Sequence, residues 1–186
     1  MSVAGLLLAA GAGTRMGEPK ALVEGADGVP WVVSSARALL AGGCDEVVVV
    51  IGAAEARVRP LLADVPVNPV FASEWADGMG ASLRVGLSAL ASDSRAEAAV
   101  VHLVDLPDVG SGVVQRLVRL AGHHTLARAA YGEQRLGHPV VLGRDHWRGV
   151  IATAVGDRGA RDYLLDRDVT VVDCSDLATG VDIDTR

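Results

Sequence analysis

Aromatic side chains and lysine are both scarce in this sequence. Phe, Trp and Tyr make up 3% of the 186 residues, so the core must be built from Val, Leu, Ile and Ala. The 17 Lys and Arg residues include a single lysine, Lys20. Chance can place one lysine anywhere. In a chain that otherwise uses arginine for its surface charge, however, Lys20 suggests a need for a compact and flexible ammonium group.

Basic charge and cysteine are limited as well. The formal net charge of −6 argues against nonspecific binding to nucleic acid, because such binding needs a basic face. Cys44 and Cys174 have no metal-ligand spacing and are too few for a disulfide framework, which fits a reducing cytoplasm. The sequence has neither the pattern of a signal peptide nor an apolar run of the ~20 residues that span a bilayer. We therefore expect a cytoplasmic protein without nucleic-acid or membrane partners.

The chain alternates between apolar strands and helices. Its length predicts one domain over residues 1–186, and a hydrophobic content of 50% is ordinary for a folded globular protein. The alternation of strand and helix in the first seventy residues predicts parallel βαβ units, and therefore an α/β fold with a mainly parallel central sheet. Strands are predicted at 3–10, 45–51, 67–71, 98–104, 123–131, 136–142 and 169–172, and helices at 30–40, 53–62, 79–90, 110–120, 144–154 and 156–165.

The first predicted strand runs directly into a glycine-rich loop. Gly11, Gly13 and Gly17 leave the backbone N–H groups of this loop free of neighbouring Cβ atoms. A row of such N–H groups can cradle a phosphate. Arg15 and Lys20 would then supply the positive charge that a triphosphate needs.

Two common nucleotide-binding motifs do not match this loop. The glycines have the spacing G-x-G-x-x-x-G instead of the dinucleotide pattern G-x-G-x-x-G, and the second strand ends in Ile51-Gly52 without an acidic residue. The P-loop pattern also fails, because Lys20 follows Pro19 and is not followed by Ser or Thr. The sequence therefore indicates a phosphate-binding loop of another kind.

Acidic residues suited to a metal occur at the end of the fourth long apolar strand and at the end of the chain. Asp105 directly follows that strand, where open α/β sheets bind ligands, and its carboxylate suits magnesium. An N-cap role for the helix at 110–120 is the alternative, but Asp108 is closer to that helix and better placed to cap it. In the segment 181–186, alternation with Ile183 predicts that Asp182 and Asp184 lie on one face.

Two further stretches and one histidine are candidate ligand contacts. Gly80 and Ser82 lie at the start of the helix at 79–90, where an anion would be attracted, although an ordinary loop and helix start is the alternative. The stretch 156–161 opens a short helix with two Arg and two Gly, which indicates either an anion site or a turn with solvated arginines. His138 lies between Gly137 and Pro139. We expect it in an exposed loop, with a structural role and contact with substrate as equal alternatives.

The N-terminal motif resembles the signature of a known family. Leu8-Ala9-Ala10-Gly11, Arg15-Met16-Gly17 and Pro19-Lys20 are similar to the signature of the MobA-like nucleotidyltransferases. The resemblance covers nearly the whole chain and implies a single Rossmann-like three-layer domain of the nucleotide-diphospho-sugar transferase (GT-A) type. Leu-Ala-Ala-Gly, where guanylyltransferases usually have Leu-Ala-Gly-Gly, favours cytidine. Further stretches resemble the molybdenum cofactor cytidylyltransferase branch, at residues 75–83, 105–107, 137–139, 156–161 and 182–185.

This resemblance implies a reaction and assigns roles to residues. A cytidylyltransferase of this branch moves CMP from CTP to the phosphate of molybdopterin, releases pyrophosphate and uses Mg²⁺. Arg15, Lys20 and Asp105 would be catalytic, and the metal ligands would be Asp105 and Asp184, with Asp182 as the alternative to Asp184. His138 and Arg161 would face the acceptor. The nucleotide-binding residues would be Leu8, Ala9, Ala10, Gly11, Gly13, Gly78, Gly80 and Ser82.

Other functions within or beside this family stay open on the sequence. The same fold could transfer GMP, or act on another phosphorylated acceptor. A non-enzymatic accessory protein that delivers the molybdenum cofactor, through transient contact with a molybdoenzyme, is a second alternative. A related branch is described as a reductase of a nicotine-derived pigment, but the dinucleotide pattern that such chemistry prefers is missing here.

Overall fold

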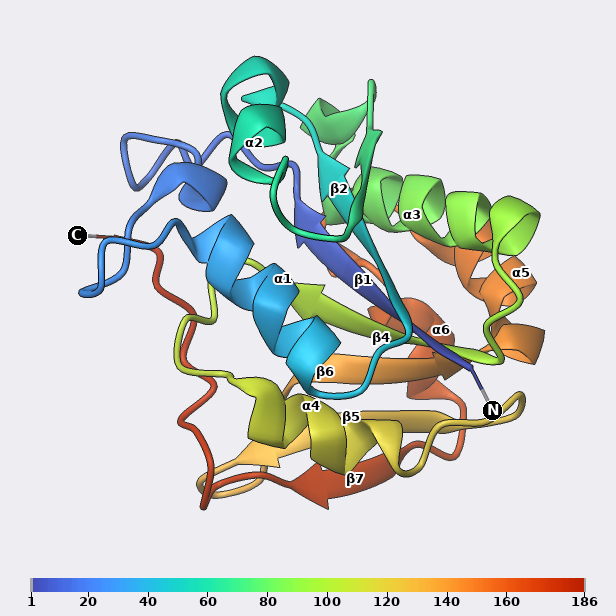
Figure 1. Ribbon diagram of the computed structural model, residues 1–186. Helices are drawn as coiled ribbons and strands as arrows, with labels where there is room; N and C mark the ends of the chain where they lie inside the picture. The colour runs from blue at the N-terminus through green and yellow to red at the C-terminus, as the bar shows by residue number, and fades with distance from the viewer. Residues whose placement is uncertain (1, 186) are drawn as a thin grey trace.

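A seven-stranded sheet forms the middle layer of the protein, whose computed structural model describes residues 2–185 (Figure 1). The strand order is β3-β2-β1-β4-β6-β5-β7. Only β6 runs antiparallel to its neighbours, and every other neighbouring pair is parallel, which confirms the predicted mainly parallel sheet. The strands are β1 (Val3–Ala9), β2 (Glu46–Ile51), β3 (Asn68–Phe71), β4 (Ala98–Leu103), β5 (Leu126–Tyr131), β6 (Arg135–Gly143) and β7 (Thr170–Asp173).

Helices cover both faces of this sheet and complete the predicted three layers (Figure 1). One face carries α1 (Trp31–Ala41), α2 (Glu55–Leu61) and α4 (Ser111–Val118). The other carries α3 (Met79–Asp93), α5 (Arg144–Thr153) and α6 (Arg161–Leu165). Three short 3₁₀ turns lie in the connections, namely η1 (Lys20–Leu22), η2 (Trp75–Asp77) and η3 (Gly156–Arg158).

The apolar strands supply a core on each face of the sheet. Successive side chains of a strand point to opposite faces, so Leu6 packs on the α3 side and Leu7 on the α1 side, both fully buried. Strands that are buried on both faces read as continuous apolar runs, as β1 and β2 do. Cys44 and Cys174 are free thiols and both are buried. Across residues 2–185, no helix is both long and apolar enough to cross a membrane.

Two predictions about local structure are wrong. Asp108 does not cap α4, whose N-cap is Gly110 without a side-chain hydrogen bond. The Asp108 carboxylate instead accepts hydrogen bonds from the backbone N–H and the hydroxyl of Thr179, both at 2.6 Å, because the C-terminal segment returns past it. His138 is half-buried within β6 and not in an exposed loop.

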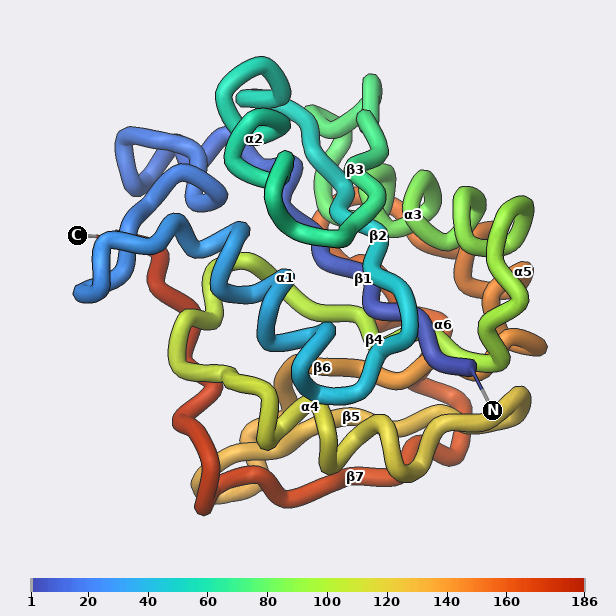
Figure 2. The backbone as a smooth tube through the Cα atoms, viewed as in Figure 1, coloured from blue at the N-terminus to red at the C-terminus, as the bar shows by residue number. Residues whose placement is uncertain are grey.

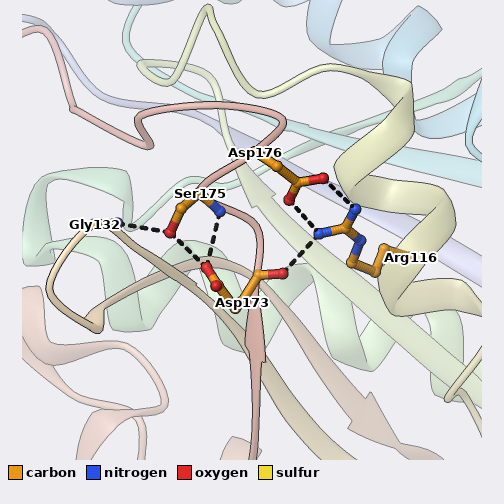
Figure 3. Close-up of polar contacts among 5 residues, drawn as sticks. All are labelled: Arg116, Gly132, Asp173, Ser175 and Asp176. Carbon is orange, nitrogen blue, oxygen red and sulfur yellow. Dashed lines mark hydrogen bonds and ion pairs between the residues drawn. The ribbon is translucent and has the colours of Figure 1, made fainter.

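The chain that follows β7 returns along the sheet to the loop after β1, where Asp184 accepts a hydrogen bond from Arg15 (Figure 2). Figure 3 shows how Arg116 of α4 holds the start of this segment. Its guanidinium donates to both carboxylate oxygens of Asp176, at 2.6 and 2.8 Å, and to the carbonyl oxygen of Asp173 at 2.7 Å. Ser175 accepts from the N–H of Gly132 at 2.9 Å, which ties the same turn to the β5–β6 connection.

The rest of this segment is held by the contacts of Thr179 with the Asp108 carboxylate and by a backbone hydrogen bond further along. The N–H of Ile183 donates to the carbonyl oxygen of Asp105 at 3.0 Å, directly after β4. The next residue, Asp184, is thereby placed at the carboxyl edge of the sheet. The position of Asp184 thus depends on contacts that begin at Arg116.

We predict that Arg116→Ala loosens the C-terminal segment. The amides of residues 174–185 should exchange hydrogen for deuterium several-fold faster, because the planar two-point contact with Asp176 is lost. Arg119→Ala is the matched control at the end of the same helix, since among residues 2–185 the Arg119 side chain hydrogen-bonds only to Gln115, at 3.4 Å. Equal exchange in the two variants would contradict the role given to Arg116.

Candidate active site

A cleft of about 500 Å³ lies at the carboxyl edge of β1 and β4. The two strands are parallel, so the loops that follow them meet at the same edge. Residues from five separate parts of the chain line the cleft: Leu8, Ala10 to Met16 and Lys20; Trp75, Ala76, Gly78, Met79 and Ser82; Leu103, Val104 and Asp105; Asp157; and Asp184.

The glycine loop is shaped by its own backbone. Gly13 has a φ of +63°, and a Cβ there would lie 1.8 Å from the carbonyl oxygen of Glu18, so only glycine fits. The carbonyl oxygen of Gly13 accepts hydrogen bonds from the N–H groups of Met16 and Gly17, at 2.9 and 3.0 Å. By contrast, a Cβ on Gly11 would meet no atom within 4 Å. Gly11 lines the cleft, so it exposes bare backbone there.

Lys20 joins two carboxylates that are far apart in the sequence. Its ammonium donates to Asp105 Oδ2 at 2.7 Å and to Asp184 Oδ1 at 2.5 Å. Arg15 donates to the other oxygen of Asp184 at 3.0 Å. The Lys20 and Asp105 side chains are 17% and 19% exposed, whereas Asp184 is 41% exposed. The inner pair is therefore screened less by water than the outer one.

These contacts fix the charges at the mouth of the cleft. Burial acts to lower the pKa of Lys20, but hydrogen bonds and attraction from Asp105 and Asp184 outweigh it and raise that pKa above its usual value. The hydrogen bond from Lys20 is the main cause that lowers the pKa of Asp184. Lys20 is therefore protonated and Asp184 ionised at neutral pH.

The two carboxylates could also hold a divalent cation. Asp105 Oδ1 is buried and has no hydrogen-bond partner among residues 2–185, although Asp105 Oδ2 and Asp184 already converge on one cation. No group of three or more His, Cys, Asp and Glu side chains in the described chain is arranged to hold a metal. Magnesium usually takes one or two carboxylates and completes its shell with phosphate oxygens and water. The donor set therefore fits magnesium bound together with a polyphosphate.

Most of the residues that the sequence singles out do line the cleft. Arg15, Lys20, Asp105 and Asp184 line it, and so do six of the expected nucleotide contacts, Leu8, Ala10, Gly11, Gly13, Gly78 and Ser82.

Three of the expected residues lie elsewhere. The Ala9 side chain packs in the core on the α1 side. Gly80 is buried where α3 meets the chain after α5, since a Cβ on it would lie 2.7 Å from the N atom of Val155. Asp182 is exposed and does not line the cleft, so the two carboxylates of the C-terminal segment do not share a face toward it.

The two expected acceptor residues lie outside this cleft lining. His138 is in β6, the strand next to β4, and Arg161 is the first residue of α6. Both interact electrostatically with Arg128 of β5, a residue that belongs to none of the motifs found in the sequence.

Two residues of the cleft wall were also missed. Trp75 opens the 75–83 stretch and could have been found there, because it is the large side chain of that motif. In the 156–161 stretch the arginines drew attention, whereas Asp157 is the residue that lines the cleft. Arg158 instead pairs with Asp162 at 3.2 Å.

A second hollow, of about 610 Å³, lies between α2 and β3. Its only ionisable lining residues, Glu55 and Arg59, pair with each other at 2.7 Å. The cleft beside Lys20, with its convergent charges and bare loop backbone, is therefore the better candidate for chemistry.

Comparisons with known proteins identify relatives of this chain. The MobA-like NTP transferase domain model matches residues 5–171. Nicotine blue oxidoreductase of Paenarthrobacter nicotinovorans is 38% identical over 192 residues, which cover 98% of this chain and 92% of that protein.

Solved structures with the same fold span nearly the whole chain. Rv0371c of Mycobacterium tuberculosis H37Rv has a TM-score of 0.83 at 26% identity, over 100% of this chain and 94% of that one. Its complex with manganese has a TM-score of 0.77 at 25% identity, over 98% and 94%. A nucleotidyl transferase from Methanothermobacter thermautotroptrophicus has a TM-score of 0.85 at 24% identity, over 99% and 92%. On the match of the domain model and the 38% identical relative, this chain belongs to the MobA-like NTP transferase family.

Proposed function

We propose that this protein transfers a nucleoside monophosphate, CMP from CTP, to the phosphate of a molybdopterin-type acceptor and releases pyrophosphate. One observation carries the proposal: Lys20, Asp105 and Asp184 converge beside a glycine loop with exposed backbone. This arrangement offers N–H groups and cations for a triphosphate and carboxylates for its metal. Membership of the MobA-like NTP transferase family supports the reaction class.

The chain's residues would act by binding and charge stabilisation. Backbone N–H groups between Gly11 and Gly17 would hold the β- and γ-phosphates, while Arg15 and Lys20 neutralise their charge. An oxygen of the acceptor phosphate attacks the α-phosphorus, a new P–O bond forms, and the bond to the β-phosphate breaks. The electron pair leaves with pyrophosphate, and no covalent enzyme intermediate is required.

Magnesium suits the carboxylates of Asp105 and Asp184. When bound, it would supply Lewis-acid stabilisation of the phosphate oxygens. The orphaned buried Oδ1 of Asp105 supports this assignment, and the manganese complex of Rv0371c shows that a relative of the same fold binds a divalent metal.

A redox reaction is the second candidate, because nicotine blue oxidoreductase is 38% identical over almost the whole chain. Two features argue against a bound dinucleotide. The glycine loop lacks the G-x-G-x-x-G spacing, and β2 ends in Ile51 without an acidic residue for a ribose. The reductase reading predicts that the protein consumes NADH or NADPH in the presence of a quinone-like dye.

The deciding experiment supplies magnesium and each of CTP, GTP, ATP and UTP, with and without molybdopterin, and measures pyrophosphate. We expect release with CTP that requires molybdopterin. Release that requires another nucleotide would show that the base assigned here is wrong. Release with another phosphorylated acceptor would show that the assigned acceptor is wrong. Oxidation of NADH or NADPH without any pyrophosphate release would overturn the proposal in favour of the redox reaction.

We predict that Lys20→Met and Asp105→Asn each lower the rate of pyrophosphate release by ~100-fold or more, since the first removes a positive charge beside the phosphates and the second removes a carboxylate that would hold their metal. Circular dichroism should show an unchanged fold. Arg37→Gln on the exposed side of α1 is the control, with normal activity expected. Near-normal turnover of either variant would remove the role assigned to that residue.

A separate prediction concerns metal binding without nucleotide. In the free protein Lys20 occupies both carboxylates, so Mn²⁺ should bind weakly when measured by electron paramagnetic resonance. Lys20→Met should tighten Mn²⁺ binding by about tenfold or more, because charged hydrogen bonds contribute about 1.5–3 kcal/mol each. Arg15→Met should tighten it less, since Arg15 contacts only the more exposed Asp184. Unchanged or weaker binding in Lys20→Met would contradict this competition.

Two glycine variants distinguish the role of the loop in folding from its role in binding a ligand. Gly13→Ala should lower the free energy of unfolding by at least about 1 kcal/mol, because alanine is strained at positive φ and its Cβ meets the Glu18 carbonyl. Gly11→Ala should leave the stability unchanged yet weaken CTP binding, because its methyl group enters the open space of the cleft. Denaturant unfolding measures the stability of both variants, and calorimetric titration measures their binding of CTP. Tight CTP binding by Gly11→Ala would contradict the role of this loop in phosphate binding.

A further inference from the structure

Three basic side chains gather on the face of the sheet that α5 and α6 cover, next to the cleft. Arg128 lies in β5, directly opposite Val140 of β6, and Val140 belongs to the core on that face. His138 precedes Val140 by two residues in β6, and Arg161 is the first residue of α6. We call Arg128, His138 and Arg161 the basic cluster.

No acidic side chain compensates the basic cluster. Within residues 2–185, none of its three side chains makes a hydrogen bond or an ion pair, and Arg128 Nε is buried without a partner. Burial and the neighbouring Arg161 both lower the pKa of Arg128. Its positive charge is therefore destabilised by loss of water and by repulsion from a second cation. A half-buried cation that faces a second cation is costly unless an anion offsets it.

His138 adds a hydrogen-bonding group without adding charge. Burial, and then the positive charge of Arg128, lower the pKa of His138 to about 4. Its imidazole is therefore neutral at neutral pH, with one nitrogen as a donor. Two guanidinium groups beside a neutral imidazole match an oxyanion such as phosphate or carboxylate.

The distance from the reacting centre indicates which anion the basic cluster would take. Strand β6 lies between β5 and β4, and neighbouring strands are about 4.8 Å apart. Arg128 therefore starts roughly 10 Å along the sheet from β4, the strand that leads to Asp105. Leu103, at the end of β4, lines the cleft, and the antiparallel register that pairs Val101 with Val140 brings His138 of β6 across from it.

We propose that Arg128, Arg161 and His138 form an oxyanion subsite for a second anionic group of the acceptor, distinct from the phosphate that attacks the nucleotide. The subsite rests on the proposed function for the identity of its ligand as an acceptor. It narrows that acceptor to a molecule with an anionic group at each of two separated positions. Arg128 anchors the remote group, and Arg161 and His138 complete its shell.

The test uses the imidazole resonances of the intact protein, with His138 assigned from the His138→Gln variant. Titration with inorganic phosphate should shift the His138 resonance in a saturable manner. Arg128→Gln should weaken this binding by tenfold or more, as expected when a charged hydrogen-bond donor is removed. Arg37→Gln, an exposed change on the opposite face, should leave it unchanged. A parallel titration with acetate distinguishes a tetrahedral oxyanion from a carboxylate by which of the two binds more tightly.

Three results would overturn the subsite. They are a His138 resonance that does not respond to either anion, equal weakening in Arg128→Gln and Arg37→Gln, and a loss of CTP binding in Arg128→Gln as large as the loss of phosphate binding. The last would place Arg128 in the nucleotide site. Since His138 reports anion binding locally, failure of the pyrophosphate assay would reject the proposed function without affecting this result.

Discussion

The ammonium group of Lys20 is the contact on which the cleft depends. It joins the turn after the glycine loop to Asp105 behind β4 and to Asp184 near the end of the chain, across 85 and 164 residues of sequence. A largely buried ammonium must be neutralised, and two carboxylates do so here. The same contact therefore closes the loop, orients Asp105 and keeps the C-terminal segment at the edge of the sheet.

In this arrangement the charged side chains of the cleft neutralise one another. The carboxylates suited to a metal are neutralised by a lysine, and the lysine suited to a phosphate is neutralised by carboxylates. A triphosphate that arrives with its metal would exchange both partners at once and leave the charge balanced. A metal alone would displace Lys20 from the carboxylates and leave the ammonium unpaired, and a triphosphate alone would leave the carboxylates unpaired.

The fold does not decide the reaction by itself. A relative with 38% identity is named as an oxidoreductase, while the matching domain family is named for transfer from nucleoside triphosphates. One fold can support different reactions, so a reaction can be assigned only from the side chains of the site. Here the charges of Lys20, Asp105 and Asp184 converge beside the glycine loop, and the basic cluster lies on the strands next to β4 and on α6.

The sequence by itself determined the features that depend on short segments. Apolar runs predicted β1, β2 and β4, and the glycine spacing together with Lys20 and Asp105 predicted residues that line the cleft. Only the tertiary structure decided which residues from distant segments meet. It brought Asp184, and not Asp182, to Lys20, paired Asp108 with Thr179 instead of the α4 cap, and brought Arg128 to His138. These outcomes depend on how the C-terminal segment returns along the sheet and how β6 inserts between β4 and β5, and neither is encoded in local periodicity.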